Sequence, residues 1–216
     1  MTFRDRREAG RALAAALDGY RSRRPFVLAI PRGGIVVGYE VAKALEAPLD
    51  VVVPRKLRAP HNPELAIGAV AQDGSVYYDS PLVGTLQVPE DYLKDEVAFQ
   101  MEEIRRRLAA YRGDRPPPAL DGRVAIVVDD GIATGSTMIA ALRAVRRMRP
   151  EATVAAVPVA PPEGCESLRA EADEVVCLYT PVMFYAVGQF YEDFAQTSDE
   201  EAIALLRARE RELYGR

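Results

Sequence analysis

The stretch VAIVVDDGIATGST, residues 124–137, runs from five apolar residues into two adjacent aspartates and then a loop of small residues. A short apolar run of this kind is typical of a strand buried on both faces of a parallel sheet. Apolar residues recur at helical spacing after the loop and predict a helix over residues 136–148. The order of strand, loop and helix indicates an α/β fold with a ligand site beyond the carboxyl end of the strand.

The segments on either side extend this pattern. Further apolar runs predict strands at residues 26–30, 49–53, 153–157 and 174–178. Amphipathic segments predict helices at residues 6–20, near 163–171 and at 199–214, and a further helix that follows the glycine pair Gly33-Gly34 and ends at Leu45. We therefore expect an open, mainly parallel twisted sheet with helices on both faces. Residues 66–71 and 76–78 flank Gln-Asp-Gly-Ser and predict a β-hairpin.

The chain is expected to be one domain over residues 1–216. Its core spans about residues 24–180, and a helical insertion spans about residues 80–122, with a long charged helix at 90–111 and a proline-rich connector at 114–122. Residues 181–216 are expected to form a small hood.

Composition limits the classes of function. The chain has 216 residues, of which 49% are hydrophobic and 28% charged, an ordinary globular balance. Its net charge of -4 argues against a general nucleic-acid partner. The sequence shows no apolar run of signal-peptide length at its start and none long enough to cross a bilayer, so we expect no membrane partner. Cys165 and Cys177 are interpreted as reduced thiols of a cytoplasmic protein.

The two halves of the opening stretch suit opposite ends of one ligand. Ionised Asp129 and Asp130 only accept hydrogen bonds, so a vicinal diol such as that of ribose is a natural partner. The loop at residues 131–137 provides flexible glycines, hydroxyl donors and the free N–H groups that open a helix, which together favour a phosphate. The simpler alternative is a turn at Asp129-Asp130-Gly131 followed by a Ser136 helix cap. A Walker P-loop is excluded because no Gly-Lys-Ser/Thr closes the loop, and a dinucleotide fingerprint is excluded because the glycines lack its spacing.

The stretch resembles the phosphoribosyl-pyrophosphate (PRPP) motif of the type I phosphoribosyltransferases, which is an apolar strand, two acidic residues and a Thr-Gly-x-Thr loop. The resemblance extends from about Phe26 to Leu178 in the order of elements. It implies transfer of a 5-phosphoribosyl group from PRPP to a nitrogenous base, with release of pyrophosphate. It also implies that Asp129 and Asp130 hold the ribose hydroxyls. The residues implied to surround the 5-phosphate are Gly131, Ile132, Ala133, Thr134, Gly135, Ser136 and Thr137.

A second anion site is expected for the pyrophosphate. Arg32, Gly33 and Gly34 follow the strand at residues 26–30, and they supply a forked cation and accessible backbone N–H groups. The alternative is a glycine turn with a surface arginine. The segment resembles the pyrophosphate loop of the family, which often contains a non-proline cis peptide. We therefore predict a cis or otherwise strained bond between Pro31 and Arg32.

Two more cations, Arg55 and Lys56, lie just after the strand at residues 49–53. They are expected to neutralise the departing pyrophosphate and are grouped with Asp129 and Asp130 as catalytic residues. A solvated surface pair is the alternative. The only histidine, His61, and the nearby Glu64 are left without a role.

The resemblance also implies a Mg²⁺ cofactor, which we expect on the pyrophosphate and ribose oxygens, with Asp129 and Asp130 acting mostly through water. The aromatic segment after Pro181 loosely resembles the base-binding stretch of purine enzymes. Phe184 or Tyr185 would then stack on the base, and Glu192 or Asp193 would serve a second metal ion. These aromatic residues would otherwise simply pack the C-terminal helix on the sheet.

Three classes of function remain. The leading interpretation is a phosphoribosyltransferase, with PRPP and a small-molecule base as partners and nucleobase salvage as its expected context. We expect a homodimer, because members of the family commonly pair, and the insertion is a candidate for a lid or a dimer contact. The alternative is a regulator that senses PRPP or a nucleotide. A hydrolase that uses the aspartate pair fits less well, because it would need acidic residues two positions apart. Salt links that turned Asp129 and Asp130 inward, with no space above the loop, would contradict the first interpretation.

Overall fold

The computed structural model describes residues 1–113 and 115–215. Its larger sheet is parallel and has five strands in the order β2-β1-β6-β7-β8. The bounds of these strands are β1 Phe26–Ala29, β2 Leu49–Val51, β6 Val124–Val128, β7 Ala152–Val159 and β8 Glu174–Tyr179. The predicted open parallel sheet is confirmed, although β2 is shorter than the predicted strand.

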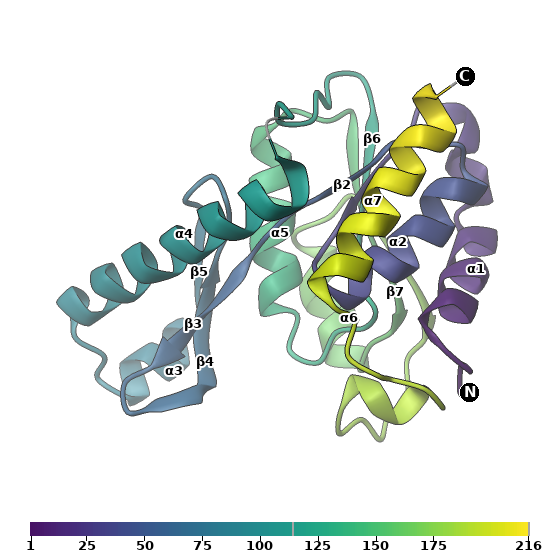
Figure 1. Ribbon diagram of the computed structural model, residues 1–216. Helices are drawn as coiled ribbons and strands as arrows, with labels where there is room; N and C mark the ends of the chain where they lie inside the picture. The colour runs from purple at the N-terminus through teal and green to yellow at the C-terminus, as the bar shows by residue number, and fades with distance from the viewer. Residues whose placement is uncertain (114, 216) are drawn as a thin grey trace.

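Helices cover both faces of this sheet (Figure 1). One face packs against α1 (Arg6–Ala16), α2 (Gly33–Ala44) and α7 (Asp199–Tyr214). The other packs against α5 (Ser136–Arg147) and α6 (Pro162–Arg169). Strand β6 shows why the sequence permits this, since Ile126 points into the first core and Val127 into the second, and both are fully buried.

The segment between the parallel strands β2 and β6 forms an arm, residues 55–112, that projects from the main body (Figure 1). A three-stranded antiparallel sheet, in the order β3-β4-β5, is joined there by helices α3 and α4. The bounds are β3 Arg55–Ala59, β4 Asn62–Val70, β5 Val76–Tyr78, α3 Ser80–Thr85 and α4 Glu90–Arg112. The predicted hairpin and the long charged helix are therefore confirmed.

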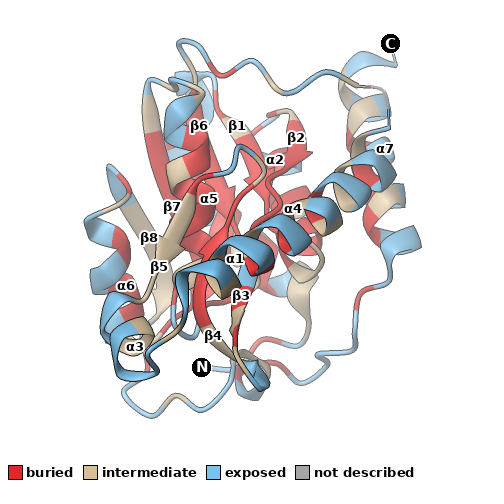
Figure 2. Ribbon diagram, turned by 90° about the vertical axis from the view of Figure 1, so that its left-hand side faces the viewer, coloured by how far each residue is buried: buried red, intermediate tan, exposed pale blue. Residues whose placement is uncertain are grey.

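The arm also departs from the expectations. Arg55 and Lys56 do follow the strand at residues 49–53, but they begin a further strand, β3, and neither β3 nor α3 was predicted. The hairpin packs through Ala69 and Ala71 against Ala140 and Ala144 of α5, so the arm rests on the body. Much of the outer surface of α4 is exposed (Figure 2). The predicted connector begins at Asp114, which lies outside the described residues.

The N-terminal segment lies beside the loop that precedes α7, whereas the C-terminus lies at the opposite end of α7 (Figure 1). Two short 3-10 helices, η1 Asp18–Arg23 and η2 Val187–Phe190, complete the secondary structure of the described residues. The N-terminal strap, residues 3–5, runs beside the hood loop, residues 181–198, through a parallel bridge between Phe3 and Tyr191. Among the described residues, no helix combines the length and the apolar character needed to cross a membrane.

Candidate functional site

The loop after β6 has the backbone that a phosphate cradle needs. Gly135 is the N-cap of α5 and has a φ of 79°, a left-handed conformation that favours glycine. A side chain on Gly131 would collide with Val187, because its Cβ would lie 2.6 Å from that residue's Cγ1 atom. Thr134 is exposed, and its Oγ1 lies 3.3 Å from the Ser136 hydroxyl. The first N–H groups of α5 have no partners within the helix and are therefore available to an anion.

The acid pair lies at the carboxyl end of β6. The backbone N–H of Asp130 donates to Asp129 Oδ1 at 2.8 Å, which fixes the first carboxylate. Burial raises the pKa of Asp129 well above its usual range, and the nearby charge of Asp130 raises it further. Burial also raises the pKa of Asp130, and the guanidinium of Arg6 opposes that rise. Negative charge at this site is costly unless a hydrogen-bond donor or a cation satisfies it.

The contact with Arg6 departs from the sequence-based expectation. Arg6 Nε lies 2.6 Å from Asp130 Oδ2, so one of the two acids does form a salt link. Space nevertheless remains above the pair, because Asp129 and Asp130 both line a cavity of about 440 Å³. The expected open site is therefore present, but one wall of it is an ion pair.

The glycine loop of β1 packs directly against the acid pair. The peptide between Pro31 and Arg32 is cis, as predicted. A Cβ on Gly33 would overlap the Asp130 carboxylate, and one on Gly34 would lie 2.9 Å from the Val128 carbonyl oxygen. Only glycine permits this close approach, which brings the second anion loop beside the first. Arg32 also contacts a residue outside the two anion loops, because its Nη1 lies 3.9 Å from Asp199 Oδ1 on α7.

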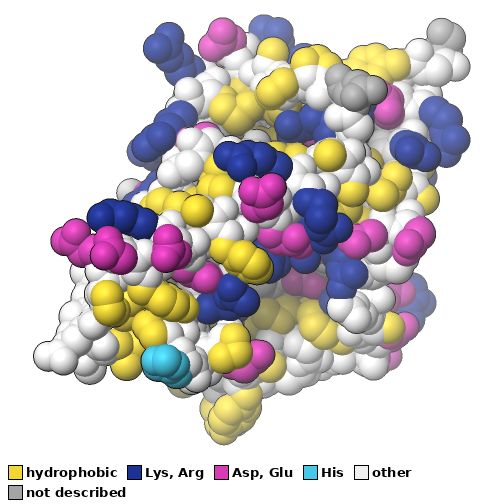
Figure 3. Space-filling view, turned by 60° about the vertical axis from the view of Figure 1, so that its left-hand side comes forward, with side chains coloured by type: hydrophobic (Ala, Val, Ile, Leu, Met, Phe, Trp, Pro, Cys, Tyr) yellow, Lys and Arg dark blue, Asp and Glu magenta, His cyan; other side chains and the backbone are white. Residues whose placement is uncertain are grey.

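Cations from the arm complete the cavity. Arg55 and Lys56 of β3 line it, as do Arg58 and two residues of α4, Gln100 and Arg107. Burial, and then the charge of Arg107, lower the pKa of Arg55. Figure 3 shows Lys and Arg side chains bordering a hollow between the arm and the main body. Concentrated positive charge of this kind favours a polyanion such as pyrophosphate.

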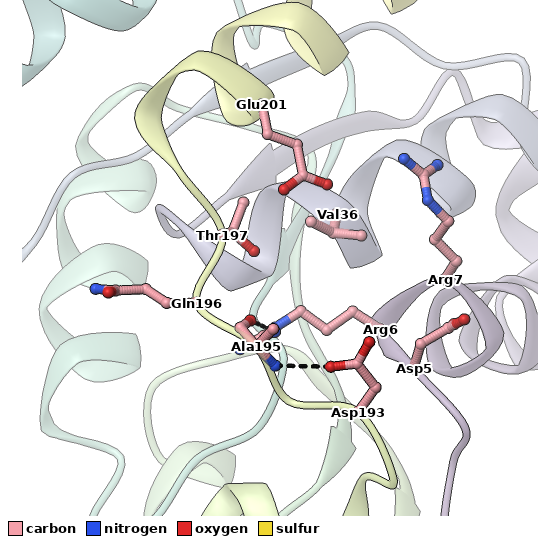
Figure 4. Close-up of a pocket in the computed structure, with 9 residues that line it drawn as sticks. All are labelled: Asp5, Arg6, Arg7, Val36, Asp193, Ala195, Gln196, Thr197 and Glu201. Atoms are coloured by element: carbon pink, nitrogen blue, oxygen red, sulfur yellow. Dashed lines mark hydrogen bonds between the residues drawn. The ribbon is translucent and has the colours of Figure 1, made fainter.

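The cavity brings together some of the predicted residues, but Gly34 and the loop residues 131–136 are not among those that line it. Its lining includes Arg32, Gly33, Arg55, Lys56, Asp129, Asp130 and Thr137. The aromatic candidates lie apart from it. Phe184 packs on Phe190 with ring centroids 5.2 Å apart, and Tyr185 is 86% exposed. Asp193 lines a second cavity, of about 240 Å³, where its carboxylate accepts a hydrogen bond from the Ala195 N–H at 3.0 Å (Figure 4).

Several residues of the site were missed. Arg6, Arg58 and Arg107 belong to arginine-rich segments and look like ordinary surface charges in the sequence. Gln100 gave a weak signal, because it is a polar residue among the apolar positions Val97, Met101 and Ile104 of its helix. It is fully buried, and its Oε1 accepts a hydrogen bond from Arg55 Nε at 3.0 Å.

The described residues hold no group of three or more His, Cys, Asp or Glu side chains arranged to bind a metal ion. A magnesium ion fits this donor set only if the ligand supplies most of its oxygens. The carboxylates of Asp129 and Asp130, which line the cavity beside the cation cluster, are the groups that would hold the waters of such an ion.

Fold and site together define an α/β protein with a cavity lined by acidic and basic side chains at the carboxyl edge of a parallel sheet. Residues 5–195 match the family described as the phosphoribosyl transferase domain. Proteins from two strains of Mycobacterium tuberculosis, both named "Putative phosphoribosyl transferase", are 44% identical to the chain over 204 residues. That match covers 94% of this chain and 46% of the relatives, so the chain spans about half of their length.

A protein from Thermus thermophilus whose crystal structure is known has a sequence 46% identical to this chain. The two structures superpose with a TM-score of 0.80, over 95% of this chain and 98% of the other. The chain belongs to the phosphoribosyl transferase domain family, as the resemblance in its sequence implied.

Proposed function

We propose that the chain transfers a 5-phosphoribosyl group from PRPP to a nitrogenous base, with release of pyrophosphate and with Mg²⁺ as cofactor. The observation that carries this proposal is the single cavity in which the acid pair faces the cations of the glycine loop and the arm. A ligand with a diol in its middle and phosphates at both ends matches this distribution of charge.

The residues of the chain then have distinct tasks. Asp129 and Asp130 accept hydrogen bonds from the ribose hydroxyls, and the residues at 131–137 hold the 5-phosphate. Arg32, Arg55 and Lys56 bind the pyrophosphate, where negative charge grows as the bond from the anomeric carbon to oxygen breaks. The electron pair leaves with pyrophosphate, the acceptor nitrogen forms the new bond to carbon, and its proton is lost. When bound, Mg²⁺ supplies further charge neutralisation at the leaving group.

The experiment is a screen of nucleobases and amines with PRPP and Mg²⁺, in which pyrophosphate release is measured. Release that depends on one acceptor, and that Asp130→Ala reduces by about a thousandfold while circular dichroism stays unchanged, would support the proposal. Unchanged turnover in Asp130→Ala would overturn the assignment of the site.

The cofactor is tested in the same assay. EDTA should abolish pyrophosphate release, and added Mg²⁺ should restore it. Arginine and lysine side chains line the cavity, and the described residues form no metal site of their own, so the ion would be held mainly by oxygens of the ligand and would stay open to EDTA. Full activity in EDTA would remove Mg²⁺ from the proposal.

A regulator that senses PRPP or a nucleotide remains the alternative. The ion pair between Arg6 and Asp130 engages one oxygen of the acid pair and is compatible with ligand binding, so it fits a sensor as well as a transferase. PRPP binding without release of pyrophosphate for any acceptor, together with a ligand-dependent gel shift, would favour the regulator.

A further inference from the structure

One charged side chain links the N-terminal helix to the acid pair at the centre of the sheet. Arg6, the first residue of α1, reaches Asp130 with its Nε 2.6 Å from Oδ2. The side chains are only 11% and 15% exposed, so this pair is shielded from water on most sides. A charge-assisted hydrogen bond at this depth restricts the orientation of the carboxylate far more than a surface pair would.

The guanidinium is itself held from two further directions by the hood loop. Arg6 Nη1 donates to the Ala195 carbonyl oxygen at 2.7 Å, and Arg6 Cζ lies 3.9 Å from the centre of the Phe194 ring. Figure 4 shows the Arg6 side chain extending from α1 toward Ala195 in the hood loop. Because these contacts do not involve Asp130, Arg6 is a fixed partner for the acid rather than a mobile one.

The backbone of Asp130 is held from the same side. The Tyr191 hydroxyl donates to the Asp130 carbonyl oxygen at 2.5 Å, and the Tyr191 ring stacks on Phe194 with centroids 5.0 Å apart. The strap fixes this part of the hood loop through backbone bonds, of which Glu192 N–H to the Phe3 carbonyl oxygen is one, at 2.8 Å. Arg6 of α1 therefore holds the side chain of Asp130, and Tyr191 of the hood loop holds its main chain.

We propose that Arg6 is a positioning residue that orients the Asp130 carboxylate for a ribose hydroxyl. This inference rests on the proposed function. Arg6 bonds to Oδ2 through one nitrogen, so Arg6 does not occupy the Oδ1 atom of Asp130, a residue that lines the cavity. The positive charge of Arg6 also offsets the repulsion between Asp130 and the adjacent Asp129, so that two partly buried acids are able to face one diol.

Two other roles for Arg6 make different predictions. If it only anchored α1 to the sheet, its loss would weaken binding of every ligand to the same extent. If it competed with ribose for Asp130, its loss would tighten binding of the sugar. A positioning role predicts a selective loss of the energy gained from the ribose hydroxyls.

The test compares ribose 5-phosphate with its 2-deoxy and 3-deoxy analogues by calorimetry, without metal, for wild type, Arg6→Gln and Arg6→Lys. Arg7→Gln is the matched control, because Arg7 is the next residue of the helix and contacts Glu40 at 3.3 Å instead of Asp130. In the wild type, at least one deoxy analogue should bind about tenfold more weakly than ribose 5-phosphate.

Arg6→Gln should reduce this discrimination between ribose 5-phosphate and its deoxy analogues to less than about threefold. Its affinity for inorganic pyrophosphate should match that of the wild type. Arg7→Gln should match the wild type in both measurements. Wild-type discrimination in Arg6→Gln, equal weakening of all ligands, or tighter ribose binding would each overturn the inference. If Arg6→Gln does not fold, Arg6→Lys decides, because its ammonium lacks the fork that contacts Asp130 and Ala195 together. Full discrimination in Arg6→Lys would then contradict the inference. A wild type that binds none of the sugars would instead refute the proposed function.

Discussion

At the scale of single residues, Gly33 determines how closely the two anion loops approach. A Cβ on this residue would overlap the Asp130 carboxylate and would lie 2.7 Å from Arg6 Nε. The glycine thus has a packing role that the sequence did not reveal, because the expected role was only an accessible backbone N–H group. Side-chain contacts between segments distant in the sequence explain why the site was only partly predictable.

Gly33→Ala should destabilise the fold by about 1–3 kcal/mol, because the added methyl group displaces Asp130 and Arg6. Binding of ribose 5-phosphate should weaken at the same time. Gly84→Ala is the control, since an added Cβ there has no neighbour within 4 Å. Urea denaturation measures the first effect and calorimetry the second, and a Gly33→Ala protein as stable as wild type would show that the approach of the loops is not close.

Asp129 provides a prediction about pH. Its pKa is raised in the folded state, so the charged form costs stability at neutral pH, and this cost disappears as the pH falls through the folded pKa. Asp129→Asn keeps an acceptor for the Asp130 N–H without the charge. We expect a melting temperature about 2–4 °C higher at pH 7, a smaller difference at acid pH, and weaker binding of ribose 5-phosphate. A lower melting temperature at pH 7 would contradict this account.

At the scale of elements, helix α4 connects the arm to the site. Gln100 accepts from Arg55 and donates through Nε2 to Glu96 Oε1 at 2.8 Å. Glu96 in turn accepts from Arg58 Nε at 2.8 Å. Arg55 is therefore held by a neutral amide and keeps its charge for a ligand, whereas Glu96 compensates the charge of Arg58. The insertion, for which the sequence suggested a lid or a dimer contact, orients cations of the cavity.

Gln100→Leu should weaken binding of inorganic pyrophosphate by about tenfold, because Arg55 loses the acceptor that orients it. Glu102→Gln is the control on the same helix, at a side chain that is 86% exposed. Calorimetry with pyrophosphate measures both variants. Equal affinities for the two would show that α4 has no part in the anion site.

The elements themselves were predicted with unequal success. Strand β6 and helix α4 have strong apolar patterns, and the structure confirms both. Strand β3 was missed because its residues, Arg-Lys-Leu-Arg-Ala, are mostly charged and lie between two prolines. It forms because β4 and α4 provide it with a pairing partner and a packing surface, and the local sequence contains neither.

At the scale of the whole molecule, the start of the chain contacts the hood loop through the strap and the acid pair at the end of β6 through Arg6. The contact with the acid pair was not predicted, because Arg6 and Asp130 are 124 positions apart and an arginine on an amphipathic helix carries no signal of its partner. The interpretation of residues 1–216 as one domain stays a prediction. So does the homodimer, which sedimentation equilibrium would reveal as twice the mass of the chain.

The most direct test of the central claim is a crystal structure of the chain with PRPP bound. We expect the ribose hydroxyls within hydrogen-bond distance of Asp129 and Asp130, the 5-phosphate against the loop at residues 131–137, and the pyrophosphate beside Arg32, Arg55 and Lys56. PRPP bound in another cavity, or bound here with its ribose turned away from the acid pair, would contradict the account.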